Sequence, residues 1–216
     1  MFERYGAWRG RVQRGMTALL LALALLAGAV QAAESRTVLV LGDSLSAAYG
    51  LAPEQGWVAL TAEKLKARHP GWRVANASVS GETTAGGASR IAGELARHQP
   101  DVVVVELGAN DGLRGLPLEH TRANLEKIIL ASREAGARVL LVGMRLPPNF
   151  GPQYTQGFER NYAELAAEHG AALLPFLLEP IAAERDAFQA DNLHPVAEAQ
   201  PRLRDHVWPA LEPLLK

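Results

Sequence analysis

Residues 101–107 read Asp-Val-Val-Val-Val-Glu-Leu, and a turn-forming stretch, Gly-Ala-Asn-Asp-Gly, follows at residues 108–112. The valine run is apolar at every successive position instead of at alternate positions. A strand with this pattern is buried on both faces, which is typical of the middle of a parallel sheet covered by helices. This stretch therefore predicts an α/β fold with a central strand at residues 101–107.

Strand-like and helix-like segments alternate on both sides of this central run. Short apolar strands are expected at residues 37–42, 73–78, 138–143 and 171–174. Helices are expected at residues 57–68, 84–98, 118–135 and 155–169, and from Pro195 to the end of the chain. The alternation predicts βαβ units with right-handed crossovers and a parallel sheet of five strands. In such sheets, functional residues gather beyond the carboxyl ends of the strands.

The composition is that of an ordinary globular domain, with 48% hydrophobic and 21% charged residues in a chain of 216. This length fits one domain of good size. Lysine and arginine number 22 against 23 aspartates and glutamates, so no basic surface for nucleic acid is expected. The chain has no cysteine, which excludes disulfides, zinc-thiolate sites, iron–sulfur clusters and cysteine nucleophiles.

The first 32 residues show the three-part pattern of a secretory signal peptide. Arginines precede an apolar run of 15 residues, Met16–Val30, and small residues at Val30 and Ala32 fit a cut after Ala32. A membrane-spanning helix needs about 20 residues, so an uncleaved anchor is the less favoured alternative. We expect a signal peptide at residues 1–32 and a single domain at residues 33–216. The mature protein is then periplasmic or secreted, without stable membrane insertion.

Residues with reactive or hydrogen-bonding groups follow the expected strands. Ser44 comes after the first strand, Gly81 after the second and Asn110 after the third, while Asp191 and His194 come after the fifth and a short helical stretch. Because the carboxyl ends of parallel strands meet at one edge of a sheet, we expect these five residues to lie close together.

This combination of residue types matches the needs of acyl transfer. A serine hydroxyl is a weak nucleophile until a base takes its proton, and His194 can serve as that base for Ser44. Asp191 can accept a hydrogen bond from the other ring nitrogen of His194. The resulting oxyanion needs preorganised donors, which the amides of Ser44 and Gly81 and the side chain of Asn110 can supply. Each residue alone has an ordinary structural explanation as a turn or capping residue, but their combination favours catalysis.

The remaining polar residues are assigned structural roles. Glu106 and Asp111 are expected to form hydrogen bonds inside the central strand end and its turn. The other histidines lie on helices or near helix ends and are interpreted as surface residues: His69, His98, His120, His169 and His206. The sequence has neither a His-Glu-x-x-His motif nor a nucleotide-binding glycine loop, so no metal ion and no cofactor are expected.

The four strand-end blocks, Gly42–Leu45, Asn76–Thr83, Gly108–Asp111 and Asp191–Pro195, resemble those of the SGNH hydrolases, also called GDSL esterases. The resemblance covers essentially the whole chain after residue 32. It implies a flavodoxin-like three-layer α/β/α sandwich with a five-stranded parallel sheet. It also implies a catalytic triad and an oxyanion hole formed by the residues assigned above: Ser44, Asp191, His194, Gly81 and Asn110.

The same resemblance places two loops beside the substrate. Ser80–Gly87 corresponds to a mobile loop, in which the adjacent residues Gly86 and Gly87 would permit motion. Residues 145–151 correspond to the loop that borders the acyl pocket. We therefore expect that loop to bind substrate through Arg145, Leu146 and Pro147.

The sequence departs from the family pattern at two positions. Ala109 stands where a second glycine is frequent, and Asn192 stands where glycine or a small residue is frequent. Ala109 adds one methyl group beside the oxyanion donor, which could trim the acyl pocket without threatening the chemistry.

Residues 105–115 (VELGANDGLRG) look like those of periplasmic family members described as acyl-CoA thioesterases, lysophospholipases and arylesterases. We expect a monomeric hydrolase of small-molecule acyl esters and thioesters that acts through a covalent acyl-enzyme. A carbohydrate acetylesterase is an alternative, although the aromatic candidates for sugar stacking are limited to Tyr49, Phe150 and Tyr154. A catalytically inactive binding module is a further alternative, against which the presence of all five functional residues argues.

Overall fold

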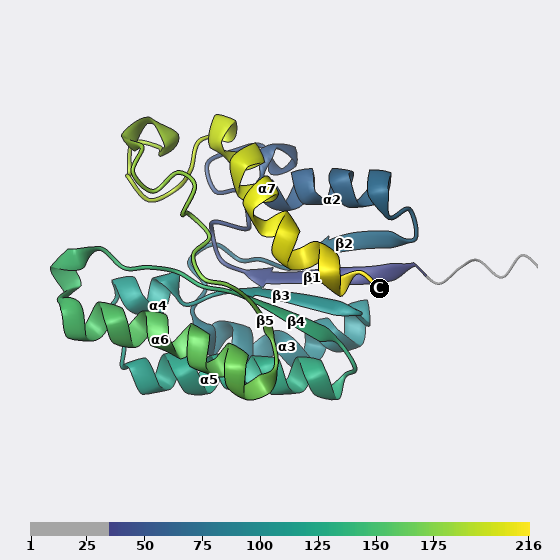
Figure 1. The fold of residues 1–216 in the computed structure, drawn as a ribbon, viewed down its shortest axis with the longest axis horizontal. Coiled ribbons are helices and arrows are strands. Elements are labelled where there is room, and N and C mark those ends of the chain that lie inside the picture. Colours follow the sequence, from purple (N-terminus) through teal and green to yellow (C-terminus); the bar gives the residue numbers. More distant parts are fainter. Residues whose placement is uncertain (1–34) are drawn as a thin grey trace, which may run out of the picture. The chain divides into compact units, whose positions relative to one another are not determined.

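Strand β3 (Val102–Glu106) lies at the centre of a five-stranded parallel sheet in the computed structural model, which describes residues 35–216 (Figure 1). The strand order is β2-β1-β3-β4-β5. The four valines of β3 are at most 1% exposed, so the central strand predicted from its apolar run is confirmed. The other strands are β1 (Arg36–Gly42), β2 (Trp72–Asn76), β4 (Arg138–Val142) and β5 (Ala172–Leu174).

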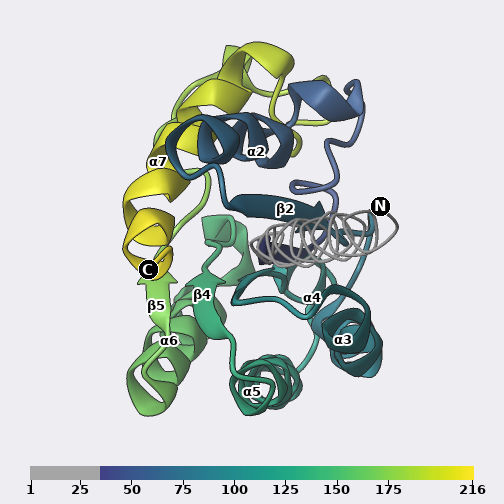
Figure 2. The same ribbon diagram turned by 90° about the vertical axis from the view of Figure 1, so that its right-hand side faces the viewer.

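Helices cover both faces of the sheet. Helices α2 and α7 lie on one face, and α3, α5 and α6 lie on the other (Figure 2). This arrangement confirms the flavodoxin-like three-layer sandwich. The helices of the described residues are α2 (Trp57–Arg68), α3 (Thr84–His98), α4 (Ala109–Leu113), α5 (Leu118–Glu134), α6 (Pro152–His169) and α7 (Gln200–Leu211).

The chain reverses its direction of winding at β1. From β1 it runs outward to β2 and then returns to form β3 on the opposite side of β1. In open α/β sheets, ligands bind at such a switch point, beyond the carboxyl ends of the two strands. Gly42 of β1 stands opposite Glu106 of β3 in the parallel register, so the segments that follow these strands emerge side by side.

Several element boundaries differ from those expected. Helix α6 begins at Pro152, three residues early, because a proline at the start of a helix has no amide hydrogen bond to lose. The last helix begins at Gln200 after a short 3₁₀ turn, and α4 was not expected from its turn-like sequence. The expected signal peptide lies outside the described residues. Among the helices of residues 35–216, none combines the length and apolar character needed to cross a membrane.

The expectation that Gly86 and Gly87 belong to a mobile loop is wrong. Both residues lie in the first turns of α3, whose start is fixed when the Thr83 side chain accepts a hydrogen bond from the Gly86 amide (3.4 Å). A Cβ atom at Gly87 would lie 2.4 Å from Cδ1 of Leu107. Gly87 therefore allows α3 to pack closely against the end of the central strand, and its role is in packing.

Candidate active site

Ser44 and His194 meet at the carboxyl edge of the sheet. Ser44 follows β1 directly, whereas His194 comes from the loop before α7. The Oγ atom of Ser44 lies 2.9 Å from Nε2 of His194, and Nδ1 of His194 lies 2.6 Å from Oδ2 of Asp191. The structure thus brings these three predicted residues into one continuous chain of hydrogen bonds.

Asp191 is held as a carboxylate. Its Oδ1 atom accepts hydrogen bonds from the amides of Leu193 (2.9 Å) and His194 (3.1 Å). The hydrogen bond from the His194 side chain, followed by these two amide bonds, lowers the pKa of Asp191 to about 2. A carboxylate is an acceptor only, so Nδ1 of His194 carries the proton and Nε2 is free to accept from Ser44.

The loop that carries Asp191 and His194 is closed on itself. The Gln189 amide donates to the His194 carbonyl (2.8 Å), and the Asn192 amide donates to the Gln189 carbonyl. Asn192 has a φ angle of 60°, a left-handed conformation that asparagine tolerates better than most residues. This conformation explains why asparagine can stand where the family often has glycine.

Two backbone amides and one side-chain amide surround the position in front of Ser44. The amides of Ser44 and Gly81 have no acceptor among the described residues. Gly81 has a φ angle of 80° and open space where a side chain would lie. The Nδ2 atom of Asn110 donates to the Glu82 carbonyl (2.9 Å) and to Oδ2 of Asp43 (3.2 Å). Both hydrogens of the Asn110 side-chain amide are therefore engaged by acceptors within the protein.

Two buried carboxyl groups lie behind the serine, and neither Asp43 nor Glu106 is exposed. Asp43 accepts from the Leu45 amide (3.0 Å), and burial raises its pKa to about 6. Glu106 accepts from the Ser46 hydroxyl (2.7 Å) through Oε2, while its Oε1 atom has no partner in the described part of the chain. Burial, with the adjacent charge of Asp43, raises the pKa of Glu106 well above its usual range, which favours its protonated form.

The structural role expected for Glu106 is thus supported, and the same holds for Asp111. Asp111 is 1% exposed, and its carboxylate accepts from the amide (2.9 Å) and the hydroxyl of Thr84 at the start of α3. Asp111 thereby ties the beginning of α3 to helix α4, in which Asn110 lies.

A pocket of about 560 Å³ opens in front of Ser44, and Gly81, Asn110 and His194 also line it. The three residues predicted to bind substrate reach this pocket. Leu146 is buried in the wall, while the Arg145 guanidinium lies over the Phe176 ring (5.1 Å) and beside Glu159 (3.4 Å). The apolar wall includes Met144, Leu146, Pro147, Phe176, Leu178 and Phe188.

Sequence reasoning missed part of this wall. Phe176 and Leu178 follow β5 and line the pocket. Because they are apolar, they do not stand out among the polar residues expected at this edge of the sheet. Tyr49, considered only as a platform for sugars, lies with its ring centroid 4.4 Å from that of His194. Phe150 and Tyr154 stack on each other and are not among the residues that line the pocket.

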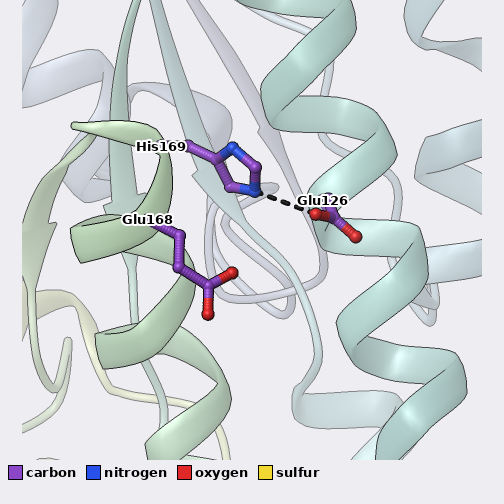
Figure 3. A group of neighbouring side chains, drawn as sticks. All are labelled: Glu126, Glu168 and His169. Carbon is purple, nitrogen blue, oxygen red and sulfur yellow. Dashed lines mark hydrogen bonds and ion pairs between the residues drawn. The ribbon is translucent and has the colours of Figure 1, made fainter.

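Away from the pocket, Glu126, Glu168 and His169 form the one group of described residues whose ligand atoms are close enough to suggest a metal site (Figure 3). Glu126 pairs with His169 (3.0 Å) and Glu168 with Arg122 (2.5 Å). These pairs link α5 to α6, so ion pairing between the helices explains the cluster.

The other histidines are less exposed than expected. His120 is exposed, whereas the other four are half-buried, and each of these four lies beside a glutamate at a distance of 3.0 to 3.9 Å.

Comparison with known proteins agrees with this geometry. The sequence profile of the GDSL-like lipase/acylhydrolase family matches residues 40–200. The chain belongs to this family. The GDSL hydrolase is 49% identical to esterase TesA of Pseudomonas aeruginosa, over 93% of this chain and all of that protein. It is 40% identical to thioesterase 1/protease 1/lysophospholipase L1 of Escherichia coli strain K12, over 86% of this chain and 88% of the relative.

A solved structure supports the same assignment. The psychrotrophic esterase EstA from Pseudoalteromonas sp., in a form inhibited by monoethylphosphonate, superposes with a TM-score of 0.80. It is 40% identical and covers 83% of this chain and 98% of the solved chain. This GDSL hydrolase is therefore an enzyme that hydrolyses ester bonds in small-molecule substrates.

Proposed function

We propose that this GDSL hydrolase is an exported serine esterase and thioesterase that acts through an acyl-enzyme on Ser44. The observation that carries the proposal is the chain of hydrogen bonds from Ser44 through His194 to Asp191, with distances of 2.9 and 2.6 Å. The mouth of an apolar pocket lies directly in front of this chain.

In the first half of the reaction, Oγ of Ser44 attacks the carbonyl carbon of the substrate while Nε2 of His194 takes the hydroxyl proton. The carbonyl oxygen becomes an oxyanion, which accepts hydrogen bonds from the amides of Ser44 and Gly81 and from the Asn110 side chain. When the tetrahedral intermediate collapses, the alcohol or thiol leaves with the proton that His194 holds. The acyl group remains on Ser44.

In the second half, His194 takes a proton from water, and the resulting hydroxide attacks the acyl carbon. Collapse returns the proton to Oγ of Ser44 and releases the carboxylic acid. No step needs a metal ion or a cofactor, because proton transfer and oxyanion binding are both supplied by the residues in place.

The pocket favours an acyl chain over an acetyl group. Its volume of about 560 Å³ and its apolar wall suit a chain of several methylene groups, each of which gains about 0.8 kcal/mol on burial. Leu146 and Pro147 would contact the chain, and Arg145 would extend the wall over Phe176. The exposed side chains of Leu113 and Leu193 continue this apolar lining to the mouth of the pocket, which suits amphiphilic esters.

The carbohydrate alternative receives less support. Of the three aromatic residues considered for sugar stacking, only Tyr49 lines the pocket, and its ring lies against His194. The alternative of an inactive binding module is also disfavoured, because such a module would not need the intact hydrogen-bond chain.

We further propose that residues 1–32 are removed on export, that the mature protein begins at Ala33, and that it is a periplasmic or secreted monomer. The proposal rests on the charged start, the short apolar run and the small residues before Ala33. The intact mass of the exported protein tests the removal of residues 1–32 and the start at Ala33, and its mass in solution by light scattering tests the monomeric state. A mass that still includes residues 1–32 would indicate an uncleaved membrane anchor.

The decisive test of the mechanism uses a fluorescent alkyl phosphonate with a p-nitrophenolate leaving group, which departs when the phosphorus bonds to a serine Oγ. The reagent should add once per molecule, on Ser44, and Ser44→Ala should stay folded without turnover. Labelling of another residue, or turnover by Ser44→Ala, would overturn the mechanism. A panel of p-nitrophenyl esters from two to sixteen carbons, with acyl-CoA, then distinguishes acetyl from longer acyl groups and esters from thioesters.

A further inference from the structure

An aromatic side chain lies against the imidazole ring of His194. The Tyr49 ring lies 4.4 Å from the imidazole, centroid to centroid, with the two planes inclined at 38°. Tyr49 is 51% exposed and lines the mouth of the pocket. An aromatic residue that stays half in water at this position stabilises the core little, so its position calls for another explanation.

The backbone around Tyr49 is bent in a way that places the ring there. Ala48 has a φ angle of 58° and Gly50 one of 76°, so left-handed residues stand on both sides of Tyr49. The left-handed conformation is unfavourable for a residue with a Cβ atom, because that atom comes too close to the following carbonyl oxygen. Ala48 is held in this conformation by close packing against Gly56. A Cβ atom added to Gly56 would lie only 2.7 Å from the Cβ atom of Ala48. Strain of this kind concentrates at functional sites.

A side-chain amide joins the Tyr49 segment to the His194 loop. Nε2 of Gln189 donates to the Tyr49 carbonyl (2.9 Å) and to the Pro195 carbonyl (3.2 Å). The backbone amide of Gln189 donates to the His194 carbonyl (2.8 Å). One residue thus fixes the spacing between the ring of Tyr49 and the ring of His194.

The aromatic face, and not the phenol group, makes the contact with His194. Within the described residues, the hydrogen bonds of Tyr49 are made by its backbone. The negative face of an aromatic ring attracts a cation placed over it, by about 0.5–1 kcal/mol at exposed sites and more when water is excluded. His194 becomes such a cation when it takes the proton of Ser44.

We propose that Tyr49 is a positioning residue for His194. Its ring holds the imidazole in line between Asp191 and Ser44 and stabilises the imidazolium that forms during acyl transfer. This inference rests on the proposed role of His194 as the base. The carboxylates that face His194 are Asp191, at Nδ1, and Asp43, through its charge; both stay in place when Tyr49 is replaced, so a change can be assigned to the ring.

Three variants separate the effect of the aromatic face of Tyr49 from the effect of its hydroxyl group and from that of an apolar side chain that only covers His194. Tyr49→Phe keeps the ring face and should match the wild type in kcat and in the pH profile of kcat/KM. Tyr49→Leu keeps an apolar cover without a π face. We expect a two- to fivefold lower kcat and an acid-limb midpoint lower by about 0.4–0.7 pH units. The midpoint falls because the protonated ring loses a stabilising contact. Tyr49→Ala should show the same midpoint and a larger loss of kcat, since positioning is lost as well.

A ring that only covers the surface would change thermal stability and KM but neither kcat nor the midpoint. A Tyr49→Leu profile that superposes on the wild type, with kcat within 1.5-fold, would therefore overturn the inference. A Tyr49→Phe variant that behaves like Tyr49→Leu would assign the effect to the hydroxyl and overturn it too. The wild-type profile tests the proposed function separately, because a wild type without an acid limb would remove the histidine base itself.

Discussion

Replacing Asn110 with alanine tests whether the side-chain amide binds the oxyanion or only fastens a loop. In the structure its Nδ2 atom donates to the Glu82 carbonyl (2.9 Å) and to the Asp43 carboxylate (3.2 Å). If the amide binds the oxyanion during acyl transfer, one of these hydrogens turns away from its present acceptor. The Glu82 carbonyl is the weaker acceptor, because hydrogen bonds to charged groups are about twice as strong as those to neutral groups.

The expected loss follows from this exchange. Removing one oxyanion donor in comparable enzymes costs on the order of 10²–10³ in kcat. Asn110 gives up a bond to Glu82 when it binds the oxyanion, and two backbone amides, those of Ser44 and Gly81, remain. We therefore expect kcat to fall about 30- to 100-fold, or roughly 2–3 kcal/mol, with little change in KM because the contact strengthens only as charge develops.

The assay is steady-state hydrolysis of a p-nitrophenyl ester, with active sites counted by phosphonate titration. Asn161→Ala is a matched control, since Nδ2 of Asn161 also donates to a backbone carbonyl (2.9 Å), that of Leu118, away from the residues that line the pocket. The control should lose stability and keep kcat. An Asn110→Ala variant with kcat per active site within threefold of the wild type would mean that the amide only fastens the loop.

Three further predictions follow from the same contacts. Asp191→Asn should lower kcat by roughly 10³–10⁴ at neutral pH, because the amide no longer enforces the Nδ1–H tautomer of His194; retained activity by stopped-flow assay would exclude this role. The pKa of Glu106 is raised in the folded chain, so Glu106 binds more protons there than in the unfolded chain. Its contribution to stability is fully present below the pKa of the unfolded chain, and it is lost as the pH rises toward the pKa of the folded chain. In urea titrations between pH 4 and 8, Glu106→Gln should therefore gain stability over the wild type as pH rises, and a constant difference would contradict the raised pKa. Gly87→Ala should lower the free energy of unfolding by about 1–3 kcal/mol through overpacking. Gly93 lies in the same helix with open space around it, so Gly93→Ala should raise the free energy of unfolding by up to about 1 kcal/mol. Equal shifts in Tm for the two variants would contradict the packing role of Gly87.

The sheet could be predicted because its strands carry an unambiguous signal. The β3 valines are apolar at every position, and only burial on both faces accounts for that. The meeting of Ser44, Asp191 and His194 could be predicted because these residues are chemically distinctive and come after strands whose ends meet. Helix α4 could not be predicted in this way, because Gly, Asn and Asp in its sequence favour turns, and only packing against its neighbours stabilises so short a helix.

Other features depend on contacts between distant segments. Alanine carries no sequence signal for a left-handed conformation, so the bend at Ala48 that places Tyr49 over His194 could not be anticipated. The same is true of the raised pKa of Asp43, which arises from burial of the whole turn. The two acceptors of the Asn110 amide come from segments 28 and 67 residues away, a pairing that spacing along the chain does not reveal.

The residues Gly42 and Asp43 shape the turn that carries Ser44. A Cβ atom at Gly42 would lie 2.7 Å from Ser46, so only glycine lets the chain turn so tightly after β1. Asp43 accepts a hydrogen bond from the Leu45 amide, which forms the turn, and a second one from the Asn110 side chain. Asp43 also interacts with His194 through its charge, and this interaction partly offsets the effect of burial on the pKa of Asp43. Asp43 therefore forms the turn that carries Ser44 and also holds the side chain of Asn110, the residue proposed to bind the oxyanion.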